Sequence, residues 1–247
     1  MIAKGDRLLL IDKKGKKYMV NCKGEFHTHY GVVDLDDLVG KSYGIRVETH
    51  RGEKFTVLKP SFIDYIEKMR RMPQIITPKD AAMVIAETGL SRGHSVVEAG
   101  AGSGALTIFL ADTVYPGEVH SYEIREDFAE VARENVKGFG LDNVSIKLKD
   151  VYKGVDEEDL DLVALDLPEP EKVVKVAYSS LKFGGFIFGY NPSIEQMLRF
   201  RKKAGKYFQI KTIECNVREY ESKKMGTRPK TLMVGHTGFL TFGRKVF

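Results

Sequence analysis

The chain has 247 residues, of which 43% are hydrophobic and 30% are charged. This length accommodates one sizeable core and a small accessory domain, and the apolar content is ordinary for a globular protein. Lysine and arginine outnumber aspartate and glutamate by 39 to 34, a formal net charge of +5. This excess favours an anionic partner, and a lysine-rich surface without one accounts for it about as well. The two cysteines, Cys22 and Cys215, are too few and too far apart for a disulfide framework or a metal cluster.

The first residues of the chain lack the pattern of a secretory signal peptide, and no uncharged apolar run approaches the ~18 residues of a membrane span. We therefore expect a cytoplasmic protein with no membrane partner. Asparagine and glutamine are scarce beside the charged residues, which favours a thermophilic source.

Residues 1–59 have the pattern of short strands. Arg7–Asp12 and Lys17–Asn21 are two strand-like runs joined by a turn at Gly15, and further glycines recur at hairpin spacing. We expect a small N-terminal β-barrel or sandwich over 1–59 that ends at Lys59-Pro60. Residues 60–247 then form the second domain.

Helix and strand patterns alternate through the second domain. Helices are expected over 61–72, capped by Ser61, and over 78–87, with Thr77 as N-cap and Pro78 in the first turn. Further helices are expected at 104–111, 125–138 and 173–181, and strands at 95–99, 118–123, 144–148, 160–167 and 185–190. Segments 208–214 and 238–242 have the character of antiparallel strands. This regular alternation predicts an α/β doubly wound sheet.

A glycine-rich turn follows the strand at 95–99 and opens the next helix. Gly100, Gly102 and Gly104 let the backbone turn tightly and approach a ligand closely. The spacing is G-x-G-x-G, the acidic Glu98 precedes it, and no Walker lysine follows, so a P-loop and a plain dinucleotide fold are disfavoured. The pattern favours a pocket for a ligand with a ribose and an amino-acid tail, and the alternative is a tight structural turn.

Three carboxylates end the following strands. Glu123 can accept hydrogen bonds from both hydroxyls of a ribose, and the alternative is an acid that favours the next helix N-terminus. Asp150 ends the next strand and can accept from the amine of an adenine. Asp166 ends a strand directly before Leu-Pro-Glu-Pro, so its carboxylate is expected to face the crevice at the carboxyl ends of the strands. The alternative is that Asp166 is only part of a turn.

Several segments together resemble a particular family of class I S-adenosylmethionine-dependent methyltransferases. They lie at 71–80 (RMPQIITPKD), 98–107 (EAGAGSGALT), 121–128 (SYEIREDF), 166–170 (DLPEP) and 233–240 (MVGHTGFL), and 26–31 and 36–41 fit the family's small β-domain. The chain resembles the tRNA adenine-N1 methyltransferases of the TrmI type, which modify the T-loop adenine at position 58 and, in archaeal relatives, at 57 as well. The resemblance implies a Rossmann-like fold with a mostly parallel seven-stranded sheet, and a homotetramer.

The resemblance also implies roles for individual residues. S-adenosylmethionine is the expected cofactor, tRNA is the expected partner, and Asp166 and Tyr190 are the expected catalytic residues, with Tyr190 beside the target base. The residues expected at the cofactor are Gln74, Ile76, Gly100, Gly102, Ser103, Gly104, Ala105, Leu106, Glu123, Asp150, Val151 and Asp166. Many family members carry an aromatic residue before Pro-Lys-Asp, whereas this chain has Thr77.

A mechanism follows from these roles. The target adenine must leave its stack to expose N1, which then attacks the sulfonium methyl group in line. Asp166 accepts a hydrogen bond from the N6 amine, orienting the base and stabilising its growing positive charge. No metal is expected, because His27 and His29 have no further ligands nearby. His236 is expected to be structural rather than to contact substrate.

The tRNA-binding surface is expected among clusters of lysine and arginine, which contact phosphates without reading sequence. The clusters lie at 13–17, 68–71, 199–203 and 223–230. The last is the favoured one, as a loop near the active-site mouth, because it contains Gly226 and Pro229. Two alternatives remain open: a class I methyltransferase acting on another substrate, and a non-catalytic tRNA-binding subunit of such an enzyme.

Overall fold

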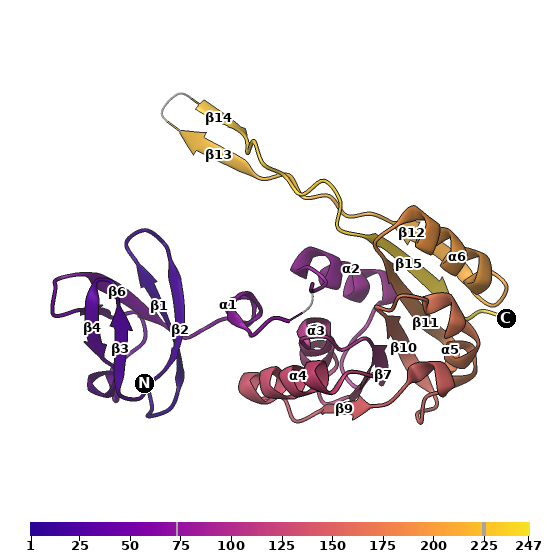
Figure 1. Cartoon of the computed structure of the whole chain (residues 1–247), viewed down its shortest axis with the longest axis horizontal. Helices are drawn as coiled ribbons and strands as arrows, with labels where there is room; N and C mark the ends of the chain where they lie inside the picture. The colour runs from indigo at the N-terminus through magenta and orange to yellow at the C-terminus, as the bar shows by residue number, and fades with distance from the viewer. Residues whose placement is uncertain (73, 224–225) are drawn as a thin grey trace. The chain divides into compact units, whose positions relative to one another are not determined.

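The computed structural model describes residues 1–72, 74–223 and 226–247 (Figure 1). The chain divides into two compact units, Met1–Met69 and Arg70–Phe247. None of the described helices is long and apolar enough to cross a membrane. Within the described residues, no group of three or more His, Cys, Asp or Glu side chains is arranged to hold a metal ion.

The first unit is built from two antiparallel sheets. A four-stranded sheet has the order β2-β1-β6-β5, and β3 pairs with β4. The strands are β1 (Arg7–Asp12), β2 (Lys17–Asn21), β3 (Glu25–Thr28), β4 (Gly31–Asp34), β5 (Arg46–Glu48) and β6 (Lys54–Leu58), with a short 3-10 turn, η1 (Asp36–Leu38). Alternate residues such as Leu8, Leu10, Phe55 and Val57 are fully buried in one core, as period-2 strands require.

Helix α1 (Phe62–Lys68) belongs to the first unit. Ser61 and Asp64 form a capping box at its start, and the Lys17 ammonium of β2 lies 2.8 Å from both Asp64 and Glu67. These ion pairs join the helix to the sheet. The boundary between the units therefore falls after residue 69 rather than after residue 59, and the helix is shorter than the expected 61–72 because Met69 is already extended.

The second unit contains a seven-stranded sheet of order β12-β15-β11-β10-β7-β8-β9. Strands β7 to β11 are parallel, and β15 pairs antiparallel with both β11 and β12. The strands are β7 (Val96–Ala99), β8 (Val119–Glu123), β9 (Val144–Leu148), β10 (Leu160–Leu165), β11 (Leu181–Asn191), β12 (Gln209–Ile213) and β15 (Phe239–Arg244). The expected doubly wound sheet and its late antiparallel strands are confirmed.

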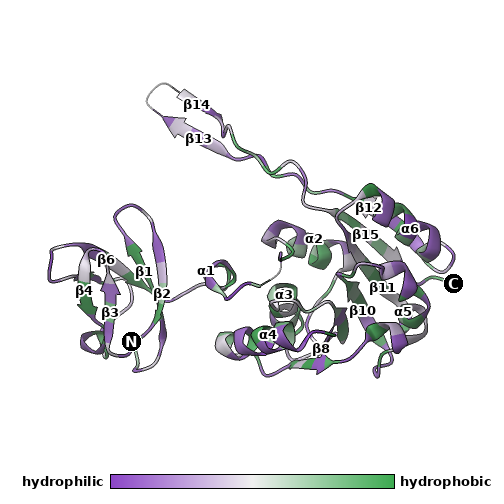
Figure 2. Ribbon diagram, viewed as in Figure 1, coloured by the Kyte–Doolittle hydropathy of each residue, from purple (hydrophilic) through white to green (hydrophobic). Residues whose placement is uncertain are grey.

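Helices cover both faces of this sheet. They are α2 (Pro78–Thr88), α3 (Ala105–Val114), α4 (Glu126–Phe139), α5 (Val174–Ser180) and α6 (Ile194–Ala204), with 3-10 turns η2 (Val151–Lys153) and η3 (Pro170–Lys172). Leu162 and Ala164 of β10 pack with α2 and α3, whereas Val163 and Leu165 pack with α5 and α6. Strand β10 is buried on both faces, and its sequence LDLVAL is apolar except for the partly buried Asp161 near its start (Figure 2).

Besides the shorter α1, helix α6 and the segment 220–229 differ from expectation. Helix α6 was not predicted, because its sequence IEQMLRFRKKA is strongly charged and only one stripe of it is buried. The expected loop at 223–230 is wrong, because Tyr220–Lys223 (β13) pairs with Gly226–Pro229 (β14) in an antiparallel hairpin. Pro229 is tolerated because both strands of this two-stranded sheet are edge strands. Lys224 of the favoured cation cluster lies outside the described residues.

Candidate cofactor and substrate site

The carboxyl ends of β7, β8 and β10 open into a cavity of about 380 Å³ in the second unit. Ligands of open α/β sheets bind at this edge. The cavity is lined by Gln74, Ile75, Ile76, Glu98, Gly100, Ala101, Gly102, Ala105, Leu106, Glu123, Ile124, Arg125, Phe128, Asp166, Leu167 and Pro168. Most of the residues expected at the cofactor thus lie around one space.

The glycine loop forms the floor of this cavity. Gly100 and Gly102 have φ angles of +93° and +53°, which side-chain-bearing residues rarely adopt. The loop is held close to the sheet, since the Gly100 amide donates to the Tyr122 carbonyl at 2.9 Å. A Cβ on Gly100 would stand only 2.1 Å from the Asp166 carbonyl oxygen. Glycine at position 100 therefore lets the loop pack against the Asp166 backbone, and Gly100 and Gly102 both line the cavity without a side chain.

Glu123 is a buried carboxylate at the end of β8. It accepts hydrogen bonds from the amides of Gly102 at 3.0 Å, Ile124 at 2.9 Å and Arg125 at 3.0 Å. Oε1 accepts from Ile124 and Arg125, whereas Oε2 accepts only from Gly102 and keeps a lone pair that can accept from a ribose hydroxyl. The carboxylate also receives the backbone donors just before α4, so the predicted ribose contact and the alternative role at the helix start are compatible.

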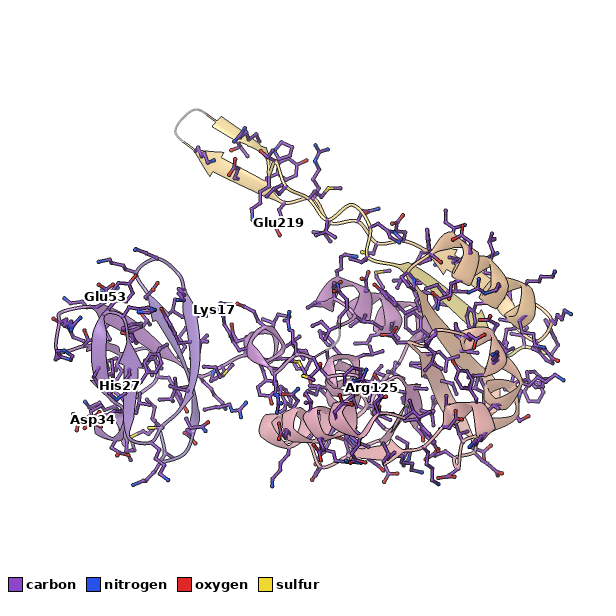
Figure 3. The ribbon with its side chains drawn as sticks, in the orientation of Figure 1. Lys17, His27, Asp34, Glu53, Arg125 and Glu219 are labelled. Atoms are coloured by element: carbon purple, nitrogen blue, oxygen red, sulfur yellow. The ribbon has the colours of Figure 1, made fainter. Side chains whose placement is uncertain are left out.

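Arg125 and Phe128 line the cavity where α4 begins. Figure 3 labels Arg125 in the second unit. The guanidinium carbon lies 3.8 Å from the centre of the Phe128 ring, and its nitrogens donate to Asp127 at 3.1 and 2.7 Å. The ring and the carboxylate together hold this cation beside the site.

Two further carboxyl groups gather at the cavity. Burial raises the pKa of Asp166 to about 6, and the nearby Glu123 charge adds to the effect. Burial raises the pKa of Glu98 to about 7, although Thr107 and Ser121 donate to it at 2.5 and 2.7 Å. Carboxylates with raised pKa values favour a ligand that brings positive charge.

Ser103 and Gly104 do not line this cavity. The Ser103 hydroxyl accepts from the Met72 amide at 2.9 Å, and its carbonyl accepts from the Asn135 side chain at 2.8 Å. Gly104 begins α3 and lies against Ala132 of α4. Both residues therefore support the glycine loop on the side away from the cavity.

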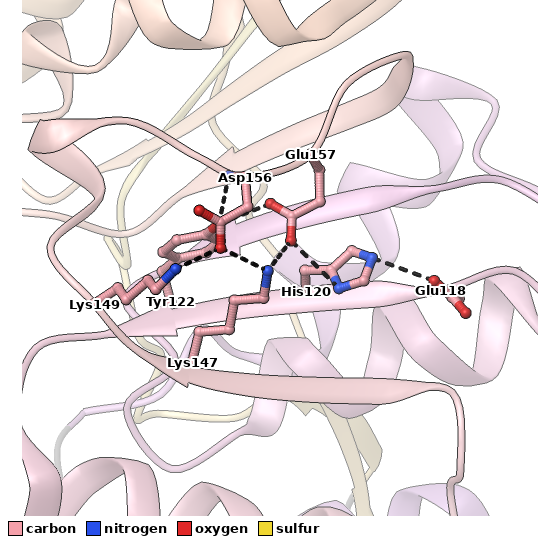
Figure 4. A network of polar contacts seen from close by, with 7 residues as sticks. All are labelled: Glu118, His120, Tyr122, Lys147, Lys149, Asp156 and Glu157. Carbon is pink, nitrogen blue, oxygen red and sulfur yellow. Dashed lines mark hydrogen bonds and ion pairs between the residues drawn. The ribbon is translucent and has the colours of Figure 1, made fainter.

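Asp150 and Val151 lie after β9 and also stand outside the cavity lining. Asp150 caps η2, accepting from the Tyr152 amide at 3.0 Å, and Val151 is buried. The following loop is fastened to β8 and β9 by a polar network (Figure 4). Its members are Glu118, His120, Tyr122, Lys147, Lys149, Asp156 and Glu157. This network holds the loop that follows Asp150 and Val151, the residues predicted to contact the adenine.

Tyr190 is buried at the end of β11 and does not line the cavity. Its hydroxyl donates to the Thr237 carbonyl, and a Cβ on Gly238 would lie 2.5 Å from its ring. The raised pKa of Tyr190, about 12, comes mainly from burial, with the Asp80 and Asp166 charges adding to it. The phenol is therefore a donor that fastens residues 237 and 238.

Further polar contacts hold residues 236–237 and 214–215. These residues lie where the chain returns from the β13–β14 hairpin to the sheet and where it leaves the sheet. The Lys79 ammonium of α2 lies 2.7 Å from Asp80, from the Cys215 carbonyl and from the Thr237 hydroxyl. His236 contacts Glu214 at 2.5 Å and the Pro192 carbonyl at 3.0 Å, as expected of a structural residue. Both ring nitrogens face acceptors, and the hydrogen bonds to Glu214 and Pro192 raise the pKa of His236 above its ordinary value.

The sequence analysis noted Glu98 only as an acid before the loop. The other cavity-lining residues that it did not expect at the cofactor are Ile75, Ala101, Ile124, Arg125, Phe128, Leu167 and Pro168. Each is a direct neighbour of an expected residue or begins the helix after it. Adjacency to the strand ends was the available signal. Phe128 is not adjacent to a strand end in the sequence, and only the first turn of α4 brings it back to the cavity.

Many of the candidate phosphate-binding cations are engaged with acids. Lys13 pairs with Glu53 at 3.2 Å, Arg70 with Glu134 at 3.0 Å and Lys17 with Asp64. In the hairpin, Glu221 pairs with Lys223 at 3.0 Å and Arg228 at 2.8 Å, and Glu219 pairs with Lys230. The hairpin is therefore less positive than its count of lysine and arginine indicates.

Comparisons with known proteins agree with this site. Residues 59–227 match the family model of the tRNA methyltransferase complex GCD14 subunit, and residues 1–47 match the TrmI-like N-terminal model. The tRNA (adenine(57)-N(1)/adenine(58)-N(1))-methyltransferase TrmI of Methanocaldococcus jannaschii is 38% identical, over 96% of this chain and 94% of the relative.

Two solved structures share the whole architecture. A SAM-dependent O-methyltransferase from Thermotoga maritima has a TM-score of 0.92 and 34% identity, covering 100% of this chain and 95% of its own. The tRNA (m1A58) methyltransferase TrmI of Aquifex aeolicus has a TM-score of 0.85 and 28% identity, covering 100% and 99%. The Rossmann-like class I methyltransferase fold is confirmed, and the chain belongs to the TrmI family of tRNA methyltransferases.

Proposed function

We propose that this protein transfers a methyl group from S-adenosylmethionine to N1 of an adenine in the T-loop of tRNA. The observation that carries the proposal is the meeting of the glycine loop, Glu123 and Asp166 around one cavity in a chain of the TrmI family. Position 58 is the proposed target, with position 57 as a second one, because the Methanocaldococcus relative is named for both.

The residues present fit the cofactor. Gly100 and Gly102 line the cavity without side chains, so the amino-acid tail can lie against the loop backbone, and Glu123 keeps an acceptor for a ribose hydroxyl. Glu98 and Asp166 supply the negative charge that complements a sulfonium. We propose the cofactor-binding roles of Gln74, Ile76, Ala105 and Leu106 from the cavity lining, and those of Ser103, Gly104, Asp150 and Val151 from the family resemblance alone. When bound, S-adenosylmethionine supplies an electrophilic methyl group.

Asp166 is the proposed catalytic carboxylate. It stands at the reactive edge, and its ionised form accepts a hydrogen bond from an adenine N6 amine, which orients N1 and favours the cationic methylated ring. Its raised pKa, about 6, leaves it ionised at neutral pH. Tyr190 acts beside the base by holding residues 237 and 238, through its bond to Thr237.

The base is not stacked on a ring at position 77. The Thr77 hydroxyl donates to Asp80 at 2.8 Å, so its side chain turns towards the first turn of α2. We propose that positioning here depends on the segment 74–79 as a whole, since it lines the cofactor cavity at Gln74–Ile76 and a second cavity at Thr77–Lys79.

We propose that the protein assembles as a homotetramer. Apolar side chains are exposed in the segments that lead to and from the β13–β14 hairpin, with exposed fractions of 51% for Val217, 90% for Leu232 and 67% for Val234. Contiguous exposed apolar residues of this kind favour a protein interface. Light scattering after size-exclusion chromatography measures the mass, and a Leu232→Asp, Val234→Asp variant should run as a smaller species.

The test of function is methyl transfer from labelled S-adenosylmethionine to unmodified tRNA transcripts in which A57 and A58 are replaced singly. Loss of label with one replacement identifies the target, and partial loss with each indicates both. Asp166→Asn is the matched control, which should bind cofactor and fail to transfer. Cofactor binding without transfer to any transcript would overturn the tRNA proposal and indicate another acceptor.

A further inference from the structure

Helix α6 holds the loop that follows Asp166. Leu167 and Pro168 come directly after Asp166 and line the cavity. The side-chain amide nitrogen of Gln196 lies 2.7 Å from the Leu167 carbonyl oxygen and 3.1 Å from that of Pro168. Both partners only accept, so the side chain must present its NH2 group to them. Gln196 is 7% exposed, which makes these bonds shielded from water.

The side chain of Gln196 does not make the hydrogen bond that is common at its position in a helix. Ser193 is the N-cap of α6, and its hydroxyl accepts from the Gln196 amide at 3.3 Å. A glutamine three residues after such a cap commonly returns its side chain to the cap's own amide. Here the side chain is directed to the loop of another element instead. The stabilised element is therefore the Asp166 loop rather than the helix end.

The helix is a firm support for this contact. Phe200, one turn after Gln196 on the same face, is fully buried, and a Cβ on Gly189 of β11 would lie 2.6 Å from its ring. The Arg199 guanidinium also donates to Glu171 at 3.2 Å, beyond the loop. Within the loop, Pro168 and Pro170 have no amide to donate, so few backbone bonds can hold it.

We propose that Gln196 is a positioning residue that sets the place of the Asp166 carboxyl group in the cavity through the carbonyls of Leu167 and Pro168. The inference rests on the proposed role of Asp166. Without these two bonds the loop moves away from α6, and the carboxyl group gains water. Its pKa should then fall from about 6 towards the ordinary aspartate range, because the carboxyl group is less buried and the Glu123 charge is less close to it.

The experiment compares Gln196→Met and Gln196→Glu with the parent. The methionine side chain has the length of glutamine but no hydrogen-bond donor. The glutamate side chain also has this length, but its carboxylate places acceptors opposite the two carbonyl oxygens. Glutamate can still accept from the amide of the N-cap residue. Gln209→Met is the matched control, an exposed glutamine on β12. Three quantities are measured: amide hydrogen exchange of residues 166–173 in the cofactor-free protein, cofactor affinity, and the pH profile of transfer to tRNA.

We expect both Gln196 variants to exchange faster at 166–173, to transfer about tenfold or more slowly, and to keep cofactor affinity within about threefold. The acid limb of the pH profile should move to lower pH, which a general loss of stability would not cause. Parental exchange and pH midpoint in both variants would overturn the inference, whatever the rate. A wrong role for Asp166 can be told apart from a wrong role for Gln196. If Asp166 is not catalytic, Asp166→Asn retains transfer, whereas the hydrogen exchange of the Gln196 variants still shows whether Gln196 holds the loop.

Discussion

The backbone of Gly100 lies against the backbone of Asp166, so closely that a Cβ on Gly100 would stand 2.1 Å from the Asp166 carbonyl oxygen. The Asp166 amide also donates to the Ala99 carbonyl at 2.9 Å. The glycine loop, which is proposed to bind the cofactor, and the loop that carries the proposed catalytic carboxylate are therefore packed together, and a change in one displaces the other.

Gly100→Ala should abolish cofactor binding and transfer. The substitution strains a backbone at φ +93°, at a cost of about 1–3 kcal/mol, and also forces the Asp166 loop to move. Gly140→Ala is the matched control, since Gly140 has φ +94° and no atom within 4 Å of its added Cβ. Calorimetric titration with S-adenosylmethionine should show binding only in the control, and equal binding in both would refute the shared packing.

Glu98→Gln should remove part of the pH dependence of stability. The folded pKa of Glu98, about 7, exceeds its ordinary 4.5, so its stabilising contribution is complete below pH 4.5 and is lost as pH rises through 7. The loss amounts to about 3 kcal/mol at most. Urea unfolding of the cofactor-free protein at pH 5 and pH 8 measures it, with the exposed Glu130→Gln as control. An unchanged slope in Glu98→Gln would contradict the assignment.

Tyr190→Phe tests how Tyr190 serves the target base. The variant keeps the ring and loses the bond to the Thr237 carbonyl, which should cost about 1 kcal/mol of stability. We expect the KM for tRNA to rise several-fold while cofactor affinity stays as in the parent, with the exposed Tyr220→Phe as control. A fall in kcat with unchanged KM would instead show that the hydroxyl acts on the reacting base.

The His236 imidazole should titrate above its ordinary pKa of 6.5, because Glu214 stabilises its cation. Its contribution to holding the hairpin base is therefore complete below pH 6.5 and is lost as pH rises past the raised pKa. Histidine NMR titration measures this value in the parent and in Glu214→Gln, which should return it towards 6.5. Glu219→Gln, which removes the partner of Lys230, should leave it unchanged.

Elements with strong local signals were predictable from sequence. The expected strand at 144–148 agrees with β9 residue for residue, and helix α2 begins at Pro78 as its cap and proline predicted. Helix α6 was missed because its amphipathic stripe is narrow and its charges resemble a solvated loop. The β13–β14 hairpin was missed because Gly226 and Pro229 are ordinary loop residues, and only cross-strand pairing makes them a strand.

The sequence by itself determined the fold class, the cofactor loop and the carboxylates at the strand ends, because these depend on local periodicity and on glycine's backbone freedom. The tertiary structure decided which of them share a cavity, the burial that raises the pKa values of Glu98 and Asp166, and the ties from Gln196 and Tyr190. Those contacts join residues far apart in the chain. Desolvation and hydrogen bonding depend on what packs around a group, which the order of neighbours along the sequence does not contain.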